Sequence, residues 1–143
     1  MIETLESRGI DKGSRPRRAV LIVDDSPDML GLHKLVLELE DYTVFTASSG
    51  KQALMVLDEI AEPGLILLDM RMDDMSGPEF LEILEKTRPE TFEHVPVVYL
   101  TGVDQIPKGK HKGFLRKPLD NCKLLAAVHS FIDEEHGSVR LEH

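Results

Sequence analysis

Five short apolar runs punctuate the chain, and longer stretches with helical periodicity separate them. They lie at residues 19–23, 42–47, 65–69, 95–101 and 113–117. The run 19–23, and the run 65–69 up to its final aspartate, are continuously apolar, as expected of strands that are buried on both faces. Strand and helix patterns alternate throughout, which predicts an α/β domain: a parallel sheet with helices on both faces and right-handed crossovers.

Serine residues mark the starts of three predicted helices. Ser26 is a good N-cap before Pro27, a residue suited to the first helical position, and Ser49 and Ser76 open segments with the capping-box spacing. We expect helices over about 27–40, 50–60 and 77–86, and a closing helix over 119–134. The first helix is predicted to turn five apolar residues inward: Leu30, Leu32, Leu35, Val36 and Leu39. In the closing helix the apolar residues at helical spacing are Leu124, Leu125, Val128, Phe131 and Ile132.

Charge and composition exclude several classes of function. The 143 residues carry a formal net charge of −9, which is unfavourable for binding a nucleic-acid backbone. No apolar run approaches the roughly 18 residues of a membrane span, and the N-terminus lacks a signal-peptide core. A single cysteine, Cys122, rules out an internal disulfide and fits a reducing cytoplasm.

The domain organisation follows from where the periodic pattern begins and ends. Residues 1–17 show no sustained period, so we expect a flexible N-terminal leader. The folded domain is expected over 18–136 and a C-terminal tail over 137–143. The last residues, Leu141-Glu142-His143, are typical of the start of an expression tag.

Polar residues suited to chemistry follow four of the predicted strands. Asp24-Asp25 ends the first strand, Asp69 the third, Thr101 the fourth and Lys117 the fifth. Sites in open parallel sheets form outside the carboxyl ends of strands, so these side chains are expected to meet if the first and third strands are neighbours. Close carboxylates repel one another, and a hard cation such as Mg²⁺ removes that cost. With a lysine and a hydroxyl nearby, the set predicts phosphoryl transfer, although each residue alone could be an ordinary turn or capping residue.

The same residues lie in segments that resemble the receiver domains of bacterial two-component signalling. These segments are VLIVDDSP (20–27), ASSGKQAL (47–54), LILLDMRMDDMSG (65–77), VPVVYLTG (95–102) and FLRKPL (114–119). The resemblance covers roughly residues 18–135. It implies a flavodoxin-like, doubly wound sheet of five parallel strands in the order 2-1-3-4-5.

The resemblance also implies roles in phosphoryl transfer. Asp69 resembles the phosphoacceptor that takes a phosphoryl group from a histidine kinase or phosphotransfer protein, after which the domain changes conformation and alters its binding of a downstream protein. Asp25 resembles a direct ligand of Mg²⁺, and Asp24 a ligand acting through water. The backbone carbonyl of Arg71 is expected to supply another ligand, so the implied metal set is Asp24, Asp25, Asp69 and Arg71.

Three further residues carry implied roles. Lys117 resembles the lysine that contacts the phosphoryl group, and Thr101 the hydroxyl that moves toward it. Phe114 lies where the family keeps a rotating aromatic switch residue, although a plain core phenylalanine on a strand is the alternative interpretation.

Two departures from the family pattern bear on function. Asp73 stands where the family usually has a proline, which predicts a more mobile and more acidic loop, with the Arg71 side chain able to reach the phosphoryl group or pair with Asp73 or Asp74. The segment between Thr101 and Lys117 is short, and its residues 103–113 contain Pro107, Gly109 and Gly113, while a typical helix takes about 11–12 residues. We therefore expect the fourth helix to be vestigial or absent and the partner interface to be non-standard.

Alternative functions stay open from the residues alone. A haloacid-dehalogenase-type phosphohydrolase would need a second acidic residue two positions after its nucleophile, where this chain has Arg71. A flavodoxin-like cofactor binder would need a phosphate-cradling loop in place of Asp24-Asp25. A receiver fold could also act as a phosphate-independent interaction module. The sequence predicts neither the downstream target nor the oligomeric state.

Overall fold

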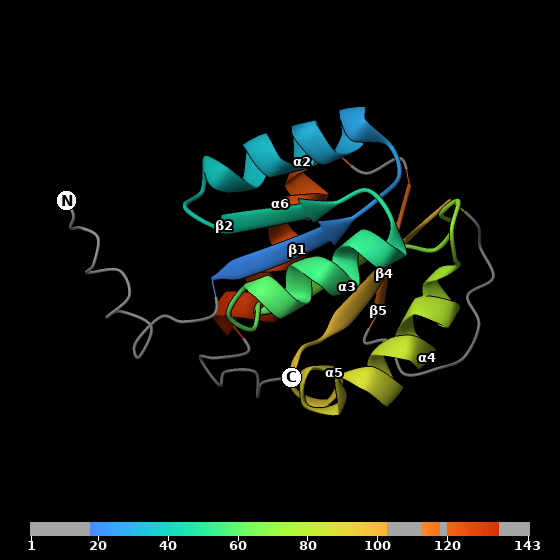
Figure 1. The fold of residues 1–143 in the computed structure, drawn as a ribbon. Coiled ribbons are helices and arrows are strands. Elements are labelled where there is room, and N and C mark those ends of the chain that lie inside the picture. The colour runs from blue at the N-terminus through green and yellow to red at the C-terminus, as the bar shows by residue number, and fades with distance from the viewer. Residues whose placement is uncertain (1–17, 103–112, 118–119, 135–143) are drawn as a thin grey trace.

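The five predicted strands form one parallel sheet in the order β2-β1-β3-β4-β5 in the computed structural model (Figure 1). Residues 18–102, 113–117 and 120–134 are described. The strands are β1 (Ala19–Val23), β2 (Thr43–Ala47), β3 (Leu65–Asp69), β4 (Val97–Thr101) and β5 (Gly113–Arg116). The predicted fold class and strand order are confirmed, with β3 at the centre between β1 and β4.

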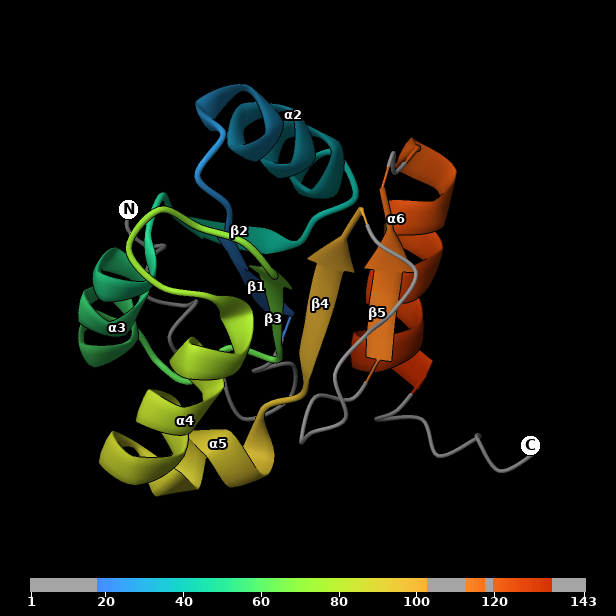
Figure 2. The ribbon, with the colours of Figure 1, turned by 90° about the vertical axis from the view of Figure 1, so that its right-hand side faces the viewer.

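Helices cover both faces of this sheet (Figure 2). One face carries α2 (Pro27–Glu38) and α6 (Asn121–His129), which a π-helical turn, η1 (Ser130–Glu134), extends. The other face carries α3 (Gly50–Glu59), α4 (Gly77–Thr87) and the short α5 (Pro89–His94). Because helices cover both faces, alternate strand residues are buried on opposite sides: Val20 and Ile22 toward α2 and α6, Leu21 and Val23 toward α3 and α4.

The predicted inner face of the first helix is partly wrong. The residues of α2 that are buried are Leu30, His33, Val36 and Leu37, whereas Leu32, Leu35 and Leu39 are 44%, 56% and 73% exposed. The helix carries two apolar stripes at helical spacing, and the stripe through position 33 is the one that packs on the sheet. Because this buried stripe contains a histidine, His33, a prediction based on apolar residues alone did not identify it.

The remaining differences concern short elements. The six-residue α5 was not predicted, because it has no side-chain cap at its start. The closing helix begins at Asn121, where the Asp120 side chain accepts the backbone N–H of Lys123 at 2.8 Å. The apolar residues that the sequence places at helical spacing there pack on the sheet: Leu124, Val128 and Ile132 are buried, and Leu125 and Phe131 pack partly buried against the same core.

The fourth helix along the described ranges is the short α5, but it lies before β4 and so is not the helix that the expectation concerned. The connection between β4 and β5, where we expected a vestigial or absent helix, falls on 103–112, outside the described residues. None of the helices within the described ranges has the length and apolar character needed to cross a bilayer.

Candidate functional site

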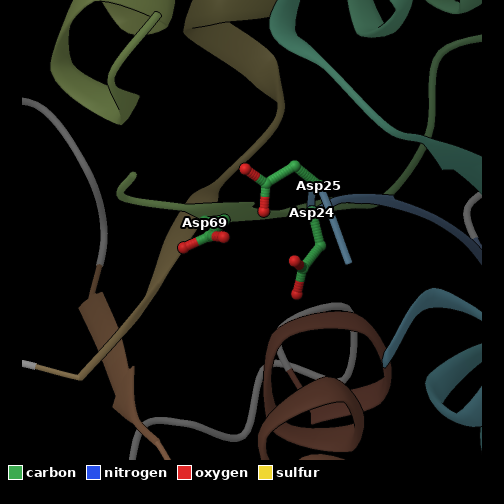
Figure 3. Close-up of side chains that lie close together, drawn as sticks. All are labelled: Asp24, Asp25 and Asp69. Carbon is green, nitrogen blue, oxygen red and sulfur yellow. The ribbon is translucent and has the colours of Figure 1, made fainter. Parts of the chain in front are cut away.

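Three aspartates gather at the carboxyl ends of β1 and β3 (Figure 3). Asp24 and Asp25 follow β1, Asp69 is the last residue of β3, and a carboxylate oxygen from each lies within 4.8 Å of the others. The two strands are neighbours in the sheet, with Val23 opposite Leu68. The prediction that the acidic groups meet depended on β1 and β3 being neighbours, and their pairing is what brings these groups together.

Local hydrogen bonds orient Asp24, which is only 1% exposed. Its backbone N–H donates to the Ala47 carbonyl at 3.1 Å and so continues the ladder between β1 and β2. Its Oδ1 accepts the backbone N–H of Ser26 at 3.0 Å, where the chain turns into α2. Its Oδ2 is buried and has no hydrogen-bond partner within the described ranges. A buried carboxylate oxygen without a donor is costly unless a cation compensates it.

Lys117 brings a positive charge to the aspartates. Its Nζ lies 3.4 Å from Asp69 Oδ1 and 3.9 Å from Asp24 Oδ2. The Lys117 backbone N–H donates to the Thr101 carbonyl at 2.7 Å, which fixes the end of β5 beside the end of β4. One ammonium beside three carboxylate side chains leaves an excess of acidic groups at the site.

The charge state of Asp69 reflects opposing influences. Burial raises the pKa of its carboxyl above the usual value, and the nearby Asp24 acts in the same direction. The Lys117 ammonium and the Arg71 backbone N–H, which donates to Asp69 Oδ1 at 3.3 Å, lower the pKa. Lys117 and this N–H therefore favour the carboxylate form, which is the nucleophilic form.

Thr101, Arg71 and Lys117, which the sequence predicted for the site, line one open pocket together with Asp69. Its walls are formed by Asp69, Met70, Arg71, Thr101, Gly102 and Lys117. Thr101 is 2% exposed at the end of β4. The structure thus brings the predicted acceptor, lysine and hydroxyl to one place, with Arg71 beside them.

The donor set fits a hard divalent cation. Its side-chain donors are carboxylate oxygens, the ligands that such cations prefer. Asp24 Oδ2, which has no hydrogen bond within the described ranges and lies 3.9 Å from Lys117 Nζ, is an oxygen that a metal cation could bind. Asp24, Asp25 and Asp69 could therefore hold a metal ion.

Phe114 does not lie in the core. It stands opposite Tyr99 in the register of β4 and β5 and is 47% exposed, whereas Tyr99 is 2% exposed. The interpretation of Phe114 as a plain core residue is therefore wrong. A switch role for it remains a prediction.

The structure reveals a role for Asp74 that the sequence did not. Its carboxylate oxygens accept the backbone N–H groups of Gly50 at 3.1 Å and Lys51 at 3.0 Å, at the start of α3. Asp74 is thus paired with a helix rather than with Arg71. The capping serine before Gly50 was a signal for the helix start, but no sequence signal marks a cap supplied from another loop.

His33 is a second residue that the sequence analysis did not single out. It is 2% exposed on α2, and neither ring nitrogen has a hydrogen-bond partner in the described part of the chain. Burial lowers its pKa, Asp24 raises it, and Lys117 lowers it. His33 therefore lies near enough to the charged site to interact with it electrostatically. Its spacing from Leu30 and Leu37 was the signal that could have placed it on the buried face.

Comparisons with known proteins identify the family. A family model described as the response regulator receiver domain matches residues 20–129. The chain is 35% identical over 121 residues to the transcriptional regulatory protein GlrR of Escherichia coli, covering 80% of this chain and 26% of GlrR. It is 32% identical over 126 residues to the transcriptional regulatory protein CpxR of the same species, covering 83% of this chain and 51% of CpxR.

A solved structure agrees with the sequence matches. The chemotaxis response regulator CheY4 of Vibrio cholerae superimposes with a TM-score of 0.71 at 26% identity, covering 80% of this chain and 98% of that one. The chain spans about a quarter to a half of the length of the two curated relatives above. It belongs to the response regulator receiver domains of two-component systems.

Proposed function

We propose that the domain is a phosphoacceptor switch in a phosphorelay: Asp69 accepts a phosphoryl group in a Mg²⁺-dependent reaction. Receiver domains of this family interact with histidine kinases or phosphotransfer proteins, and a phosphohistidine of such a partner is the donor we propose. The observation that carries the proposal is the placement of Lys117 Nζ 3.4 Å from Asp69 Oδ1, within a group of three aspartates at one edge of the sheet.

The proposed metal ligands are Asp25, Asp69 and the backbone carbonyl of Arg71 directly, and Asp24 through a water molecule. When bound, Mg²⁺ neutralises negative charge on the carboxylates and on the incoming phosphoryl oxygens. The ligand residues come from the ends of two paired strands and the loop after one of them. Their positions are therefore set by the sheet before any phosphoryl donor arrives.

Asp69, Lys117 and Thr101 have different roles in the proposed transfer step. A carboxylate oxygen of Asp69 forms a bond to phosphorus while the bond between phosphorus and the donor imidazole nitrogen breaks, and the electron pair stays on that nitrogen. Lys117 contacts the phosphoryl oxygens, and the Thr101 hydroxyl donates a hydrogen bond to them. Catalysis of this kind depends mainly on positioning and charge neutralisation.

The response to phosphorylation is proposed to run through Thr101 and Phe114. Thr101 is buried on β4 and Phe114 is half-exposed on the neighbouring β5. Movement of the Thr101 hydroxyl toward the phosphoryl group would change the packing available to Phe114 and so alter partner binding at that face. We further propose that the domain works in the cytoplasm, in keeping with its single cysteine, Cys122.

The test is phosphorylation by acetyl phosphate with Mg²⁺, read by intact mass. We expect one phosphoryl group on the wild type and none on Asp69→Asn or on a sample treated with a chelator. Asp73→Asn is the matched control, because it removes a charge from the loop next to Asp69 and is expected to be phosphorylated. If the wild type gains no phosphoryl group and binds no beryllofluoride, the proposal fails and a phosphate-independent interaction module takes its place.

A further inference from the structure

The loop that carries Arg71, between β3 and α4, folds back on itself. The Met70 backbone N–H donates to the Leu100 carbonyl at 3.0 Å, and the Gly77 N–H donates to the Met70 carbonyl at 2.9 Å. Between these two points, Arg71 and Ser76 form an antiparallel bridge. Both ends of the loop are therefore fixed to the sheet, and the tip of the loop, residues 72–75, projects beyond the bridge.

The tip is held by the first turn of α3. Asp74 Oδ1 lies 3.1 Å from the Gly50 nitrogen and Asp74 Oδ2 lies 3.0 Å from the Lys51 nitrogen. The next free amide, that of Gln52, donates to the Ser49 hydroxyl at 3.0 Å. A single carboxylate from a distant loop thus satisfies two amides that every helix leaves unpaired at its start, and its negative charge suits the positive end of the helix dipole.

Packing at the same point supports this contact. Gly50 is buried, and a Cβ added there would lie 2.5 Å from the Met75 sulfur. The loop tip therefore rests directly on the helix start, with Asp74 and its neighbour Met75 both touching it. Burial opposes the change, but the backbone N–H groups of Lys51 and Gly50 hold the pKa of Asp74 below its usual value, so its carboxylate form is the one that makes the contact.

We propose that Asp74 is a positioning residue for the metal site. By holding the loop tip on α3, it keeps the Arg71 backbone carbonyl in place to bind the same cation as the three aspartates. This inference rests on the proposed function, since the carbonyl is useful only if a cation binds. Asp74 lies outside the three aspartates whose oxygens converge, so it acts through the loop.

The chain offers a matched control in the adjacent residue. Asp73 is exposed and carries the same charge in the same loop, and no hydrogen bond to α3 involves it within the described ranges. Asp74→Ala and Asp73→Ala therefore remove equal charge, but only the first releases the loop tip. Asp74→Asn removes the charge and keeps an acceptor oxygen for one of the two amides.

The experiment measures Mg²⁺ affinity by calorimetry and the Mg²⁺ dependence of phosphorylation by acetyl phosphate. We expect Asp74→Ala to weaken Mg²⁺ binding by about tenfold, the lower end of the effect of removing groups that orient ligands. The half-saturating Mg²⁺ concentration should rise equally, while the phosphorylation rate at saturating Mg²⁺ stays near that of the wild type. Asp73→Ala should change affinity by no more than about twofold, since exposed charges are screened. Asp74→Asn should regain part of the loss.

Hydrogen exchange supplies a readout that does not depend on the metal. The amides of Gly50 and Lys51 should exchange faster in Asp74→Ala than in Asp73→Ala. Equal effects of the two alanine variants on Mg²⁺ affinity would overturn the inference while leaving the proposed function standing. A wild type that binds no Mg²⁺ would overturn both. If Asp74→Ala does not fold, the comparison of Asp74→Asn with Asp73→Asn decides the matter in the same way.

Discussion

At the scale of single residues, the site works by balancing charges that would be costly alone. Asp69 is buried beside another acidic residue, and Lys117, 3.4 Å away, opposes both effects without cancelling them, so the pKa of Asp69 stays above its usual value. This opposition lowers the cost of ionising the buried carboxyl. It also makes the lysine the side chain on which the charge state of Asp69 most depends.

Removing that lysine tests the balance. In metal-free protein, Lys117→Met should raise the pKa of the Asp69 carboxyl, because burial and Asp24 then act with less opposition. Carbon-detected NMR of the aspartate carboxyls across a pH titration measures this shift. Lys51→Met, which removes an equal charge from the start of α3, is the control and should leave the pKa of the Asp69 carboxyl unchanged. An unchanged Asp69 pKa in Lys117→Met would contradict the charge balance.

His33 makes a second residue-scale prediction. A buried polar group without hydrogen bonds costs about 1–3 kcal/mol, and both ring nitrogens of His33 lack partners in the described ranges. His33→Leu should therefore raise the free energy of unfolding at pH 7 by about 1–2 kcal/mol. Urea unfolding measures the change, with the exposed His94→Leu as the control expected to be near neutral. Destabilisation by His33→Leu would contradict this expectation and indicate that the ring nitrogens make hydrogen bonds in solution.

The pH dependence of stability gives His33 a separate signature. Burial holds its pKa in the folded protein below the usual histidine value of 6.5, so unfolding takes up a proton when the pH lies between the folded and unfolded pKa values. The stability linked to this neutral histidine is complete above about pH 6.5 and falls as the pH drops toward the folded pKa. Stability curves of the wild type and His33→Leu should therefore diverge further below pH 6.5 than above it.

At the scale of elements, helix starts and helix faces are specified differently. The capping box of α4 is complete: Ser76 Oγ accepts the Glu79 N–H at 3.2 Å, and the Glu79 carboxylate accepts the Ser76 N–H at 2.9 Å. Such contacts are local and follow from sequence. The buried face of α2 was not specified locally, because Leu32 and Leu35 fit a helical stripe as well as the buried residues do.

Two helical glycines are expected to respond in opposite directions. A Cβ at Gly77 would lie 2.7 Å from the Tyr99 ring and 3.2 Å from the Met70 Cα, whereas a Cβ at Gly31 would meet nothing within 4 Å. Gly77→Ala should lower the free energy of unfolding by about 1–3 kcal/mol through overpacking. Gly31→Ala should raise it by about 0.5–1 kcal/mol, since alanine favours helix. Urea unfolding of both variants measures this, and equal signs would contradict the close approach at Gly77.

At the scale of the whole molecule, one ionic cluster joins the two ends of the described chain. Asp133 in η1 accepts hydrogen bonds from Arg18 at 2.6 Å and Tyr42 at 2.8 Å, and His129 Nδ1 lies 2.7 Å from it. The Arg18 guanidinium also stacks 4.2 Å from the centre of the Tyr42 ring. Burial and the nearby Asp133 raise the pKa of Tyr42 to about 12. The cluster fastens the C-terminal helix to the start of β1, at the opposite end of the sheet from the aspartates.

The cluster predicts a pH-dependent contribution to stability. Partial burial opposes the change, but hydrogen bonds from Tyr42 and Arg18 lower the pKa of Asp133. Its contribution is therefore present above the unfolded pKa of about 3.9 and is lost as the pH falls through the lower folded pKa. Asp133→Asn should lower the free energy of unfolding at pH 7 by about 1–3 kcal/mol, and the difference should disappear in acid.

Chemical unfolding of both proteins from pH 7 down to about pH 2, which extends well below the unfolded pKa, measures this difference. Glu82→Gln, which removes a charge from an exposed position on α4, is the control and should be nearly neutral throughout. A constant difference between wild type and Asp133→Asn across the pH range would mean that the carboxylate charge is not what the cluster depends on.

The sequence alone was enough to predict the five strands, the starts of α2, α3 and α4, and the chemical groups of the site. Strands buried on both faces read as continuous apolar runs, helix caps depend on neighbours three residues away, and parallel strands deliver their last residues to one edge. Asp24, Asp25, Asp69, Thr101 and Lys117 could therefore be predicted together. Four features became clear only from the folded chain: which stripe of α2 faces the sheet, that α5 forms, that Asp74 caps α3, and that Asp133 contacts Arg18. These outcomes depend on packing between segments far apart in the chain, which no local pattern encodes.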